Sequence, residues 1–436
     1  MNEYDVIVIG GGAAGMFAAI QAGYAGAKTL LLEPNERLGK KLYITGKGRC
    51  NLTNACSWQE VLKNVPRNPR FLYSALSGFT PEDAVSFFES HGCETKVERG
   101  NRVFPVSDKS ASVVDALKTA LDYAGVEIIR TRARAIETEN GCVSGVKTDR
   151  GDFLAPAVIL ATGGKSYPAT GSTGDGYRMA KALGHSIVPP VGSLVPLVED
   201  GPWCAKMQGL ALKNVNVRLY EAASDSAVGT SLACPRTSDA RPCSQSSGKP
   251  VFEEFGELLF THFGLSGPVI LSASAHMEQG KSYVVEIDLK PALDEATLDA
   301  RILRDFSESK NRAFENALSG LYPKTMIPVI VERSGIPGET KVNSVTKEQR
   351  RQLLELTKHF TVKIDRRRPV EEAIVTSGGV STKEIDPKTM ESKLVPGLYF
   401  AGELIDVDAY TGGFNLQIAW ATGCAAAQAA AAAGKK

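Results

Sequence analysis

The chain has 436 residues, of which 43% are hydrophobic and 23% are charged, enough for two or three domains of ordinary globular composition. Its net charge of +1 gives no global argument for binding to nucleic acid or to a membrane surface. The eight cysteines are scattered, without a C-x-x-C pair or the density of a disulfide scaffold, which favours a reducing compartment.

The N-terminal segment that ends at Glu33 predicts a βαβ unit that binds a dinucleotide. A strand of apolar and β-branched residues leads into a G-x-G-x-x-G turn, an alanine-rich helix and a second strand closed by an acid. These parts are the strands 4–9 and 29–32, the helix 16–27, the glycines Gly10, Gly12 and Gly15, and the acid Glu33. A lone glycine motif would be weak evidence, but here all the parts follow in order.

Each part of this unit has a physical task. Gly10 allows a tight turn, Gly12 lets a pyrophosphate approach the backbone, and Gly15 lets the helix pack close to the strand. The pyrophosphate would lie at the helix N-terminus, among free N–H groups at the positive end of the helix dipole. Glu33 would accept hydrogen bonds from the ribose hydroxyls.

Glycine-rich loops then alternate with regular elements up to about residue 190. Residues 34–54 are too polar for a core and too rich in glycine for a stable helix, so we expect a loop. Residues 58–92 and 109–124 are expected to be helical, with a cap at Thr80. The later elements are the strands 126–129, 133–137, 143–148 and 158–161, the glycine loops 162–164 and 171–176, and the helix 177–183.

After Pro189 the pattern becomes typical of antiparallel strands, as in 215–220 and 283–289. Residues 224–250 are rich in Ser, Pro and Ala, and we expect a mobile insertion there. Two later segments favour helices and predict a small helical cap. They are 294–333 and 346–359.

Near Arg366 the chain is expected to return to the first domain and to end in a strand, 398–401, and a closing helix. The alanine-rich tract 418–433 contains Gln428 and little bulk, so it falls short of a membrane-spanning segment. No signal peptide precedes the first strand, because a charged residue and then glycines interrupt the short apolar run. We therefore expect a cytoplasmic protein that does not associate with membranes.

The two ends of the chain together favour FAD as the dinucleotide. Gly402-Glu403 and the Gly412-Gly413 turn place a second acid and a second helix N-terminus beside the first glycine turn. FAD is long enough to use both, and the helix N-terminus would face the flavin edge where negative charge develops on reduction. No second G-x-G-x-x-G follows a strand, so NAD(P)H, as a transient donor, must visit the flavin through the substrate opening.

Six blocks of the sequence carry a resemblance to a known family. They are 6–15, 39–41, TGKGRCNLTN at 45–54, 161–164, 261–268 and 401–403. Together they resemble the BaiN/YhiN-type NAD(P)/FAD-dependent oxidoreductases, bacterial relatives of the glutathione-reductase-like flavoproteins. The resemblance spans nearly the whole chain. It implies an α/β fold: a doubly wound Rossmann-like FAD domain with an inserted antiparallel β-barrel-like domain and a small helical cap.

The boundaries expected from this resemblance divide the chain into three domains. They are 1–190 with 366–436 for FAD, 191–292 with 355–365 for the β-rich insert, and 293–354 for the helical cap. The segment 224–250 departs from the family, in which this connection is short, and this weakens the resemblance in the insert. The oligomeric state is left open.

The resemblance also implies which residues line the FAD, and they come from both ends of the chain. They are Gly10, Gly12, Ala13, Ala14, Gly15, Glu33, Lys40, Lys41, Gly46, Arg49, Cys50, Asn51, Ala133, Thr162, Gly163, Gly164, Gly402, Glu403, Asp406, Gly413, Phe414, Asn415 and Leu416.

The family resemblance leaves the reaction open. Its members resemble reducers of conjugated C=C bonds in steroid or bile-acid-like enones, amine oxidases that use O₂, and enzymes that act on uridine in ribosomal RNA. We expect NAD(P)H-dependent enone reduction of a small molecule, with RNA binding not favoured. Such a reduction needs hydrogen-bond donors on the enone oxygen. Tyr167, His262 and Tyr410 are the candidates. A flavin-binding protein without turnover is a further alternative.

Three other patterns favour structural roles. Cys50 and Cys56 lack the C-x-x-x-x-C spacing of disulfide reductases, so packing near the flavin is favoured over a catalytic dithiol. The five histidines are never paired at i,i+3 or i,i+4, so no metal is expected. The basic run 366–368 could contact phosphate or RNA, but charge runs are usually solvated.

Overall fold

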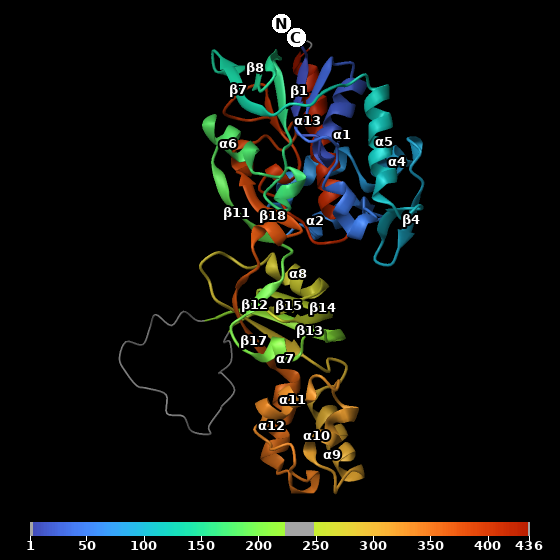
Figure 1. Cartoon of the computed structure of the whole chain (residues 1–436), viewed down its shortest axis with the longest axis vertical. Helices are drawn as coiled ribbons and strands as arrows, with labels where there is room; N and C mark the ends of the chain where they lie inside the picture. Colours follow the sequence, from blue (N-terminus) through green and yellow to red (C-terminus); the bar gives the residue numbers. More distant parts are fainter. Residues whose placement is uncertain (1–2, 223–247, 435–436) are drawn as a thin grey trace, which may run out of the picture. The chain divides into compact units, whose positions relative to one another are not determined.

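The computed structural model describes residues 3–222 and 248–434, and this part of the chain forms two compact units (Figure 1). The first contains Met1–Ser193 with Pro369–Lys436, and the second contains Leu194–Arg368. These boundaries lie close to those expected at 190/191 and 365/366. Most of the insertion expected at 224–250 lies outside the described residues.

A five-stranded parallel sheet forms the centre of the first unit, in the order β19-β10-β1-β2-β6. Its strands are β1 (Val6–Ile9), β2 (Thr29–Leu32), β6 (Glu127–Ile129), β10 (Ala157–Leu160) and β19 (Leu398–Phe400). The chain leaves β1 toward β2 on one side and later returns to β10 on the other. The strand order therefore reverses between β1 and β10, and such sheets bind ligands at the carboxyl ends of their strands at this switch point.

Two helices from opposite ends of the sequence lie side by side next to β1 (Figure 1). They are α1 (Ala13–Tyr24) and α13 (Phe414–Gly434). Small residues permit the close approach, since a Cβ added to Gly423 would lie 2.8 Å from the carbonyl oxygen of Ala14. The alanine-rich tract is therefore a helix packed on α1 and on the sheet.

The segment 58–92 contains several helices rather than one. They are α2 (Trp58–Lys63), α3 (Tyr73–Gly78) and α4 (Pro81–Ser90), with a short 3₁₀ turn, η2 (Pro69–Leu72), before α3. Asn68 has φ 54° and precedes Pro69, and this pair interrupts the helical backbone. At the start of α4, Thr80 and Asp83 form a capping box, as the sequence pattern predicts.

Smaller elements complete the first unit. These are the helices α5 (Ser110–Tyr123) and α6 (Asp175–Ala182), and the sheets β3 (Thr53–Asn54) with β5 (Arg102–Pro105) and β4 (Thr95–Glu98), β7 (Ala133–Glu139) with β8 (Cys142–Thr148) and β9 (Gly151–Leu154), and β11 (Ile187–Ser193) with β18 (Val375–Val380). The last pair lies next to both chain crossings into the second unit. It therefore anchors the connections to the first unit.

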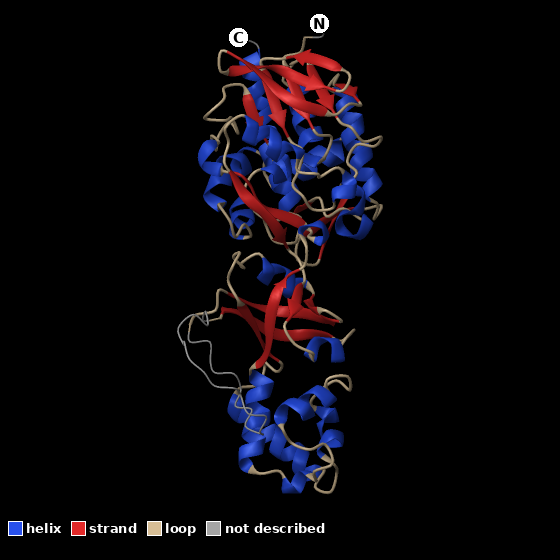
Figure 2. Ribbon diagram, turned by 60° about the vertical axis from the view of Figure 1, so that its left-hand side comes forward, coloured by secondary structure: helices blue, strands red, loops and turns tan. Residues whose placement is uncertain are grey.

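The second unit contains a closed six-stranded barrel whose neighbouring strands are all antiparallel (Figure 2). In barrel order they are β12 (Leu197–Glu199), β15 (Gly264–Ser266), β14 (Phe252–Thr261), β13 (Ala211–Glu221), β16 (Tyr283–Asp288) and β17 (Phe360–Arg367). The helices of this unit are α7 (Trp203–Lys206), α8 (Pro268–Ser274), α9 (Glu295–Glu308), α10 (Phe314–Ala317), α11 (Ile327–Ser334) and α12 (Lys347–Lys358).

Barrel and helices share one hydrophobic core, in which Phe260 and Phe360 of the barrel belong to the same cluster as Leu298 and Phe314 of the helices. A separate helical domain at 293–354 stays a prediction. The doubly wound α/β unit, the antiparallel barrel and the helical segment that the sequence predicts are confirmed. No helix of the described residues is long and apolar enough to cross a membrane.

Candidate active site

The glycine turn after β1 has the geometry of a dinucleotide site. A Cβ added to Gly10 would lie 2.6 Å from the carbonyl oxygen of Ala161, and one added to Gly15 would lie 1.8 Å from that of Gly10. Both positions therefore exclude a side chain for reasons of packing. A Cβ on Gly12 would instead meet nothing within 4 Å in the part of the chain that the structure describes. The face of Gly12 is open at the N-terminus of α1, where a pyrophosphate would bind.

Glu33 lies beside this turn and is buried, with 7% of its surface exposed. Its Oε2 accepts a hydrogen bond from the Gly11 N–H at 2.7 Å. Its Oε1 accepts hydrogen bonds from the backbone N–H and the side-chain amide of Asn35, at 2.8 and 2.6 Å. These bonds fix the carboxylate at the carboxyl end of β2, where ribose hydroxyls could reach it.

A second carboxylate, Glu403, joins loops that are distant in the sequence. Lys41 Nζ lies 2.7 Å from Glu403 Oε2 and donates to Ser166 Oγ at 2.6 Å. Glu403 Oε1 accepts from Ser166 Oγ at 2.9 Å and from the Thr376 N–H at 2.7 Å. Burial opposes ionisation, but Lys41 and these hydrogen bonds outweigh it and hold the pKa of Glu403 below its usual value. The carboxylate is therefore charged at neutral pH and ties together the loops after β2 and β10, and β18.

The C-terminal glycine turn packs on the 45–54 loop. A Cβ added to Gly413 would lie 2.2 Å from the carbonyl oxygen of Thr53. The loop is fastened to α13 by Thr53 Oγ1, which donates to Gln417 Oε1 at 2.7 Å, and by Trp420 Nε1, which donates to the Leu52 carbonyl at 2.9 Å. Close to this turn, Asn415 accepts from the Ala409 N–H at 2.9 Å.

Gly402 completes the contact between the two ends of the chain. Its φ of 71° is left-handed, and a Cβ there would lie 2.7 Å from the Cβ of Ala14 in the first turn of α1. The carboxyl end of β19 and the first glycine turn are therefore adjacent, as FAD binding across both would require.

The loop expected at 34–54 is confirmed only in part, because it contains a 3₁₀ segment, η1 (Leu42–Gly48), and ends in β3; its backbone is left-handed at Gly46 (φ 61°) and Cys50 (φ 62°). The Arg49 side chain stacks on Phe104 and pairs with Glu98 and Asp108. These contacts engage the guanidinium group with Phe104, Glu98 and Asp108, so a contact between Arg49 and FAD stays a prediction.

Cys50 is fully buried, and burial together with the nearby Cys93 raises the pKa of its thiol to about 12. We expect Cys50 to resist alkylation by iodoacetamide in the native protein at pH 8, because only the thiolate reacts. The exposed Cys142 should be labelled before Cys50 and serves as the internal control. Mass spectrometry of peptides from the labelled protein checks the order. If Cys50 is labelled as fast as Cys142, the hypothesis of a catalytic dithiol of Cys50 and Cys56 would again be favoured.

The remaining expected cofactor residues are distributed around the same strand ends. Lys40 is exposed and donates to the Ala169 carbonyl at 3.0 Å. Ala133 begins β7, four residues after the end of β6. Gly164 lies against Thr376, since a Cβ there would be 2.3 Å from Thr376 Oγ1. The others lie in the same segments: Gly163 follows Thr162 after β10, Phe414 and Leu416 open α13, and Asp406 precedes the C-terminal glycine turn.

The three candidate donors do not fall in one unit. Tyr167, with φ 51° and 36% of its surface exposed, and Tyr410 belong to the first unit, whereas the exposed His262 lies in the β14–β15 connection of the second. Sequence reasoning missed Asn35, Ser166 and Thr376, which hold the carboxylates of Glu33 and Glu403. It also missed the buried Asp408, although the pattern Asp-x-Asp before a Gly-Gly turn was readable.

The residues present fit an FAD molecule. Gly12 offers an open face, and the first N–H groups of α1 lack intrahelical partners by geometry. Two polar atoms close to the glycine loops, Asn51 Oδ1 and Thr162 Oγ1, are buried without a hydrogen-bond partner among the described residues. Such atoms are rare in folded proteins unless water or a ligand satisfies them.

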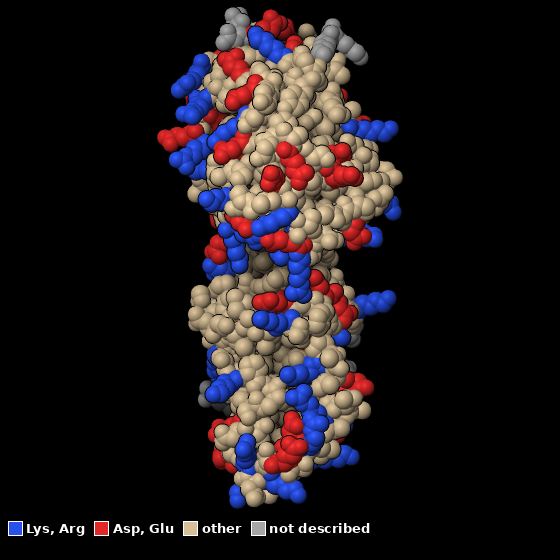
Figure 3. All heavy atoms as spheres, turned by 90° about the vertical axis from the view of Figure 1, so that its right-hand side faces the viewer, with Lys and Arg blue, Asp and Glu red and all other residues tan. Residues whose placement is uncertain are grey.

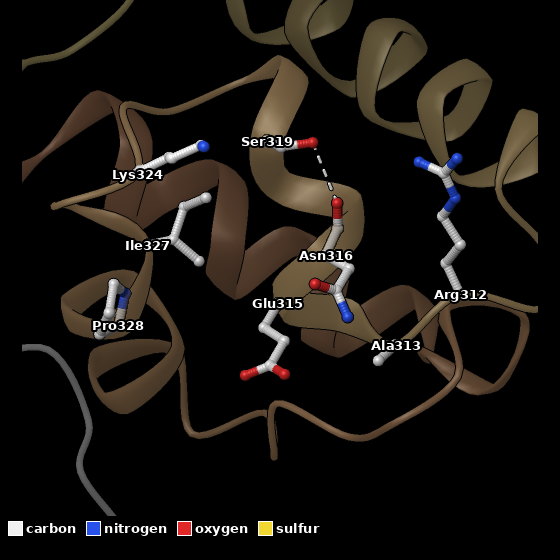
Figure 4. Close-up of a pocket in the computed structure, with 8 residues that line it drawn as sticks. All are labelled: Arg312, Ala313, Glu315, Asn316, Ser319, Lys324, Ile327 and Pro328. Carbon is white, nitrogen blue, oxygen red and sulfur yellow. Dashed lines mark hydrogen bonds between the residues drawn. The ribbon is translucent and has the colours of Figure 1, made fainter.

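A hollow in the second unit offers no comparable chemistry (Figure 4). It is lined by Arg312, Ala313, Glu315, Asn316, Ser319, Lys324, Ile327 and Pro328. Charges of both signs line it, and Ser319 Oγ donates to the Asn316 carbonyl at 3.0 Å. The glycine turns of the first unit are therefore the better candidate.

Comparisons with known proteins agree with this reading of the first unit. The model of the HI0933-like protein Rossmann domain matches residues 4–429. The 3-dehydro-bile acid Δ4,6-reductase of Clostridium scindens is 33% identical over 97% of this chain and 98% of its own. The ribosomal RNA dihydrouridine synthase of Escherichia coli is 30% identical over 98% of both chains.

A solved quinol-fumarate reductase with menaquinol matches the chain at a TM-score of 0.50 and 16% identity. It covers 100% of this chain and 72% of the other, and at this identity the likeness concerns the fold alone. The family match extends over both units and over nearly all described residues. The chain therefore belongs to the family of HI0933-like proteins with a Rossmann domain, which confirms the BaiN/YhiN-type assignment expected from its sequence.

Proposed function

We propose that this flavin-dependent oxidoreductase binds FAD and reduces a C=C bond conjugated to a carbonyl group, with NAD(P)H as the transient donor. The observation that carries the cofactor proposal is the open face of Gly12 at the N-terminus of α1, beside the buried carboxylate of Glu33. Bound FAD would supply a centre that accepts a hydride from NAD(P)H and delivers it to the substrate.

The chain's own residues would hold the cofactor at two places. The turn of Gly10, Gly12 and Gly15 would take the pyrophosphate and Glu33 the ribose. The turn at Gly413, with Asn415, would face the flavin ring, where a helix N-terminus stabilises the negative charge that reduction places there. Lys41 and Glu403 would fix the loops between these places.

The names of two relatives indicate a shared chemistry. A 3-dehydro-bile acid Δ4,6-reductase saturates bonds conjugated to a ring ketone, and a dihydrouridine synthase saturates a uracil bond conjugated to a carbonyl. Both reactions require a donor to the carbonyl oxygen and a proton for the neighbouring carbon. We propose Tyr167 or Tyr410 of the first unit as the donor, and His262 of the second unit stays a prediction from the sequence. The lead substrate is a steroid-like enone.

Uridine in ribosomal RNA is the second candidate, because two relatives with that name are each 30% identical over 98% of this chain. Charge favours the small molecule. The chain's net charge is +1, and Figure 3 shows Lys and Arg interspersed with Asp and Glu on the face drawn. A face that binds RNA would be predominantly positive, and the affinity for RNA would fall steeply as the salt concentration rises.

An anaerobic absorption spectrum tests the proposal. We expect the FAD-loaded protein to be bleached by NADH or NADPH and its yellow colour to return when a steroid enone is added. Recovery with a uridine-containing ribosomal RNA fragment, and not with the enone, would transfer the proposal to the second substrate. If the yellow colour returns rapidly in air but with neither the enone nor the RNA fragment, the proposed C=C reduction would be overturned. A preparation that cannot be loaded with FAD would overturn the cofactor.

A further inference from the structure

Two buried carboxyl groups precede the C-terminal glycine turn. Asp406 is 6% exposed and Asp408 is 1% exposed. One oxygen of each has a donor: Asn68 Nδ2 lies 3.0 Å from Asp406 Oδ2, and Ser193 Oγ lies 2.6 Å from Asp408 Oδ2. The other oxygen of each, Oδ1, is buried and makes no hydrogen bond of ordinary geometry within residues 3–222 and 248–434, although the Gly378 N–H and the Ser377 hydroxyl lie near the two carboxyls. A carboxylate buried in this way lacks the donors that its charge requires.

Burial raises the pKa of both carboxyls above the usual value. The nearby charge of Asp406 raises the pKa of Asp408 further, while Ser193, Ser377 and Arg67 oppose the shift. For Asp406, the opposing groups are Arg67, Asn68 and the N–H of Gly378. Arg67 compensates only weakly, because its Nε lies 3.9 Å from Asp408 Oδ1 and its side chain is 36% exposed.

The Tyr177 hydroxyl is a further polar group near Asp406, and Thr162 of the same unit has a hydroxyl of the same kind. Tyr177, which is 5% exposed, and Thr162 have buried hydroxyl oxygens without hydrogen-bond partners in the described part of the chain. Burial raises the pKa of Tyr177, and the negative charges of Glu403 and Asp406 add to this effect. Buried polar groups that lack a protein partner are commonly hydrogen-bonded by ordered water.

We propose that Asp406 and Asp408 together hold one exchangeable proton at neutral pH and store it for the C=C reduction; the second half of this inference rests on the function proposed above. Saturating the bond adds a hydride to one carbon and a proton to its neighbour. The carboxyl pair gives up its proton and becomes fully ionised, hydrogen-bonded water passes a proton on to the substrate, and that proton forms a C–H bond with the electron pair left by hydride addition. Water entering beside the partly exposed Arg67 returns a proton to the pair.

The test uses Asp406→Asn, Asp408→Asn and, as a matched control, Asp122→Asn on the exposed face of α5. Infrared spectra of the FAD-loaded protein are recorded at pH 7 in H₂O and in D₂O. Their difference should show the band of a protonated carboxyl group, which shifts in D₂O. The band should disappear in either cluster variant and persist in the control. Absence of the band from the unmodified protein at pH 7 would overturn the proposal. The two cluster variants are independent, so failure of one to fold leaves the other.

The pH profile of C=C reduction tests the use of the stored proton. The rate should fall at alkaline pH as the pair empties, and in the cluster variants it should be roughly tenfold or more lower at neutral pH. In Asp408→Asn, the alkaline fall of the rate should also begin at lower pH. The pKa of Asp406 is lower in this variant, because the neighbouring negative charge that raises it is gone. A persistent band with profiles that coincide in all variants would overturn the storage role. If the unmodified protein reduces no C=C substrate, the proposed function fails, and the infrared band still decides whether the pair holds a proton.

Discussion

Gly12→Val is expected to abolish FAD binding while the protein without cofactor folds normally. Gly12 has φ −81° and ψ −168°, which any residue can adopt, and a Cβ there meets no described atom within 4 Å. The added side chain would occupy the place of the pyrophosphate and remove its contacts with the N–H groups of α1. Losing two charge-assisted hydrogen bonds, worth about 1.5 kcal/mol each or more, weakens binding by about 100-fold or more.

The measurement is a titration of the cofactor-free protein with FAD, followed by flavin fluorescence, alongside urea unfolding. Gly320→Val is the matched control, because Gly320 also has an open face and lies in a 3₁₀ turn of the second unit, η4 (Leu318–Gly320). Gly15→Ala should behave differently and destabilise the fold, since its Cβ would overlap the carbonyl oxygen of Gly10 at 1.8 Å. Unchanged FAD affinity in Gly12→Val would show that the pyrophosphate does not bind at this turn.

Lys41→Met is expected to lower the stability of the folded protein strongly. It leaves the charge of Glu403 without its cation, in a place where both side chains are mostly buried, at 25% and 20% exposure. Breaking such a pair costs about 3 kcal/mol, because the remaining charge is uncompensated. Adding Glu403→Gln should restore most of the loss, since the neutral amide still accepts hydrogen bonds from Ser166 and Thr376.

Urea unfolding of the cofactor-free protein measures this effect without interference from FAD. Lys40→Met is the control, because Lys40 is the exposed neighbour and donates only to a backbone carbonyl. The pKa of Glu403 is held below its usual value, so its stabilisation is complete above the pKa of an unfolded glutamate, about 4.3, and is lost as the pH falls through the folded pKa. The Lys41→Met deficit should therefore shrink in acid. A variant as stable as the unmodified protein at pH 7 would refute the role of the pair.

Local sequence patterns were sufficient for the elements whose causes are local. The apolar run 6–9, the three glycines and Glu33 predict strand, turn, helix start and acid, and the structure has each of them in that order. The capping box at Thr80 was likewise readable because its two residues are three positions apart. The same reasoning gave 58–92 as helical but did not place the breaks, since the left-handed conformation of Asn68 depends on its contacts with Asp406.

The carboxylate environments could not be predicted in this way. Glu403 owes its ionisation to Lys41, Ser166 and Thr376, which are brought together by three different strand ends. Nothing in the sequence distinguishes Asp408 from an ordinary polar residue. In the structure it is distinguished by its hydrogen bond from Ser193 and by the burial of Asp408 Oδ1. Contacts across hundreds of residues carry no signal in one sequence.

The sequence by itself determined the βαβ unit and the class of ligand, because glycine spacing, strand apolarity and a terminal acid act within some thirty residues, and it determined the family through six blocks of residues along the whole chain. The tertiary structure alone decided that Gly12 is the glycine of the first turn with an open face, that Gly402 and Gly413 pack against Ala14 and Thr53, and that Asp406 and Asp408 are both buried. The physical reason is that open space, close approach and desolvation depend on which distant segments the fold brings together.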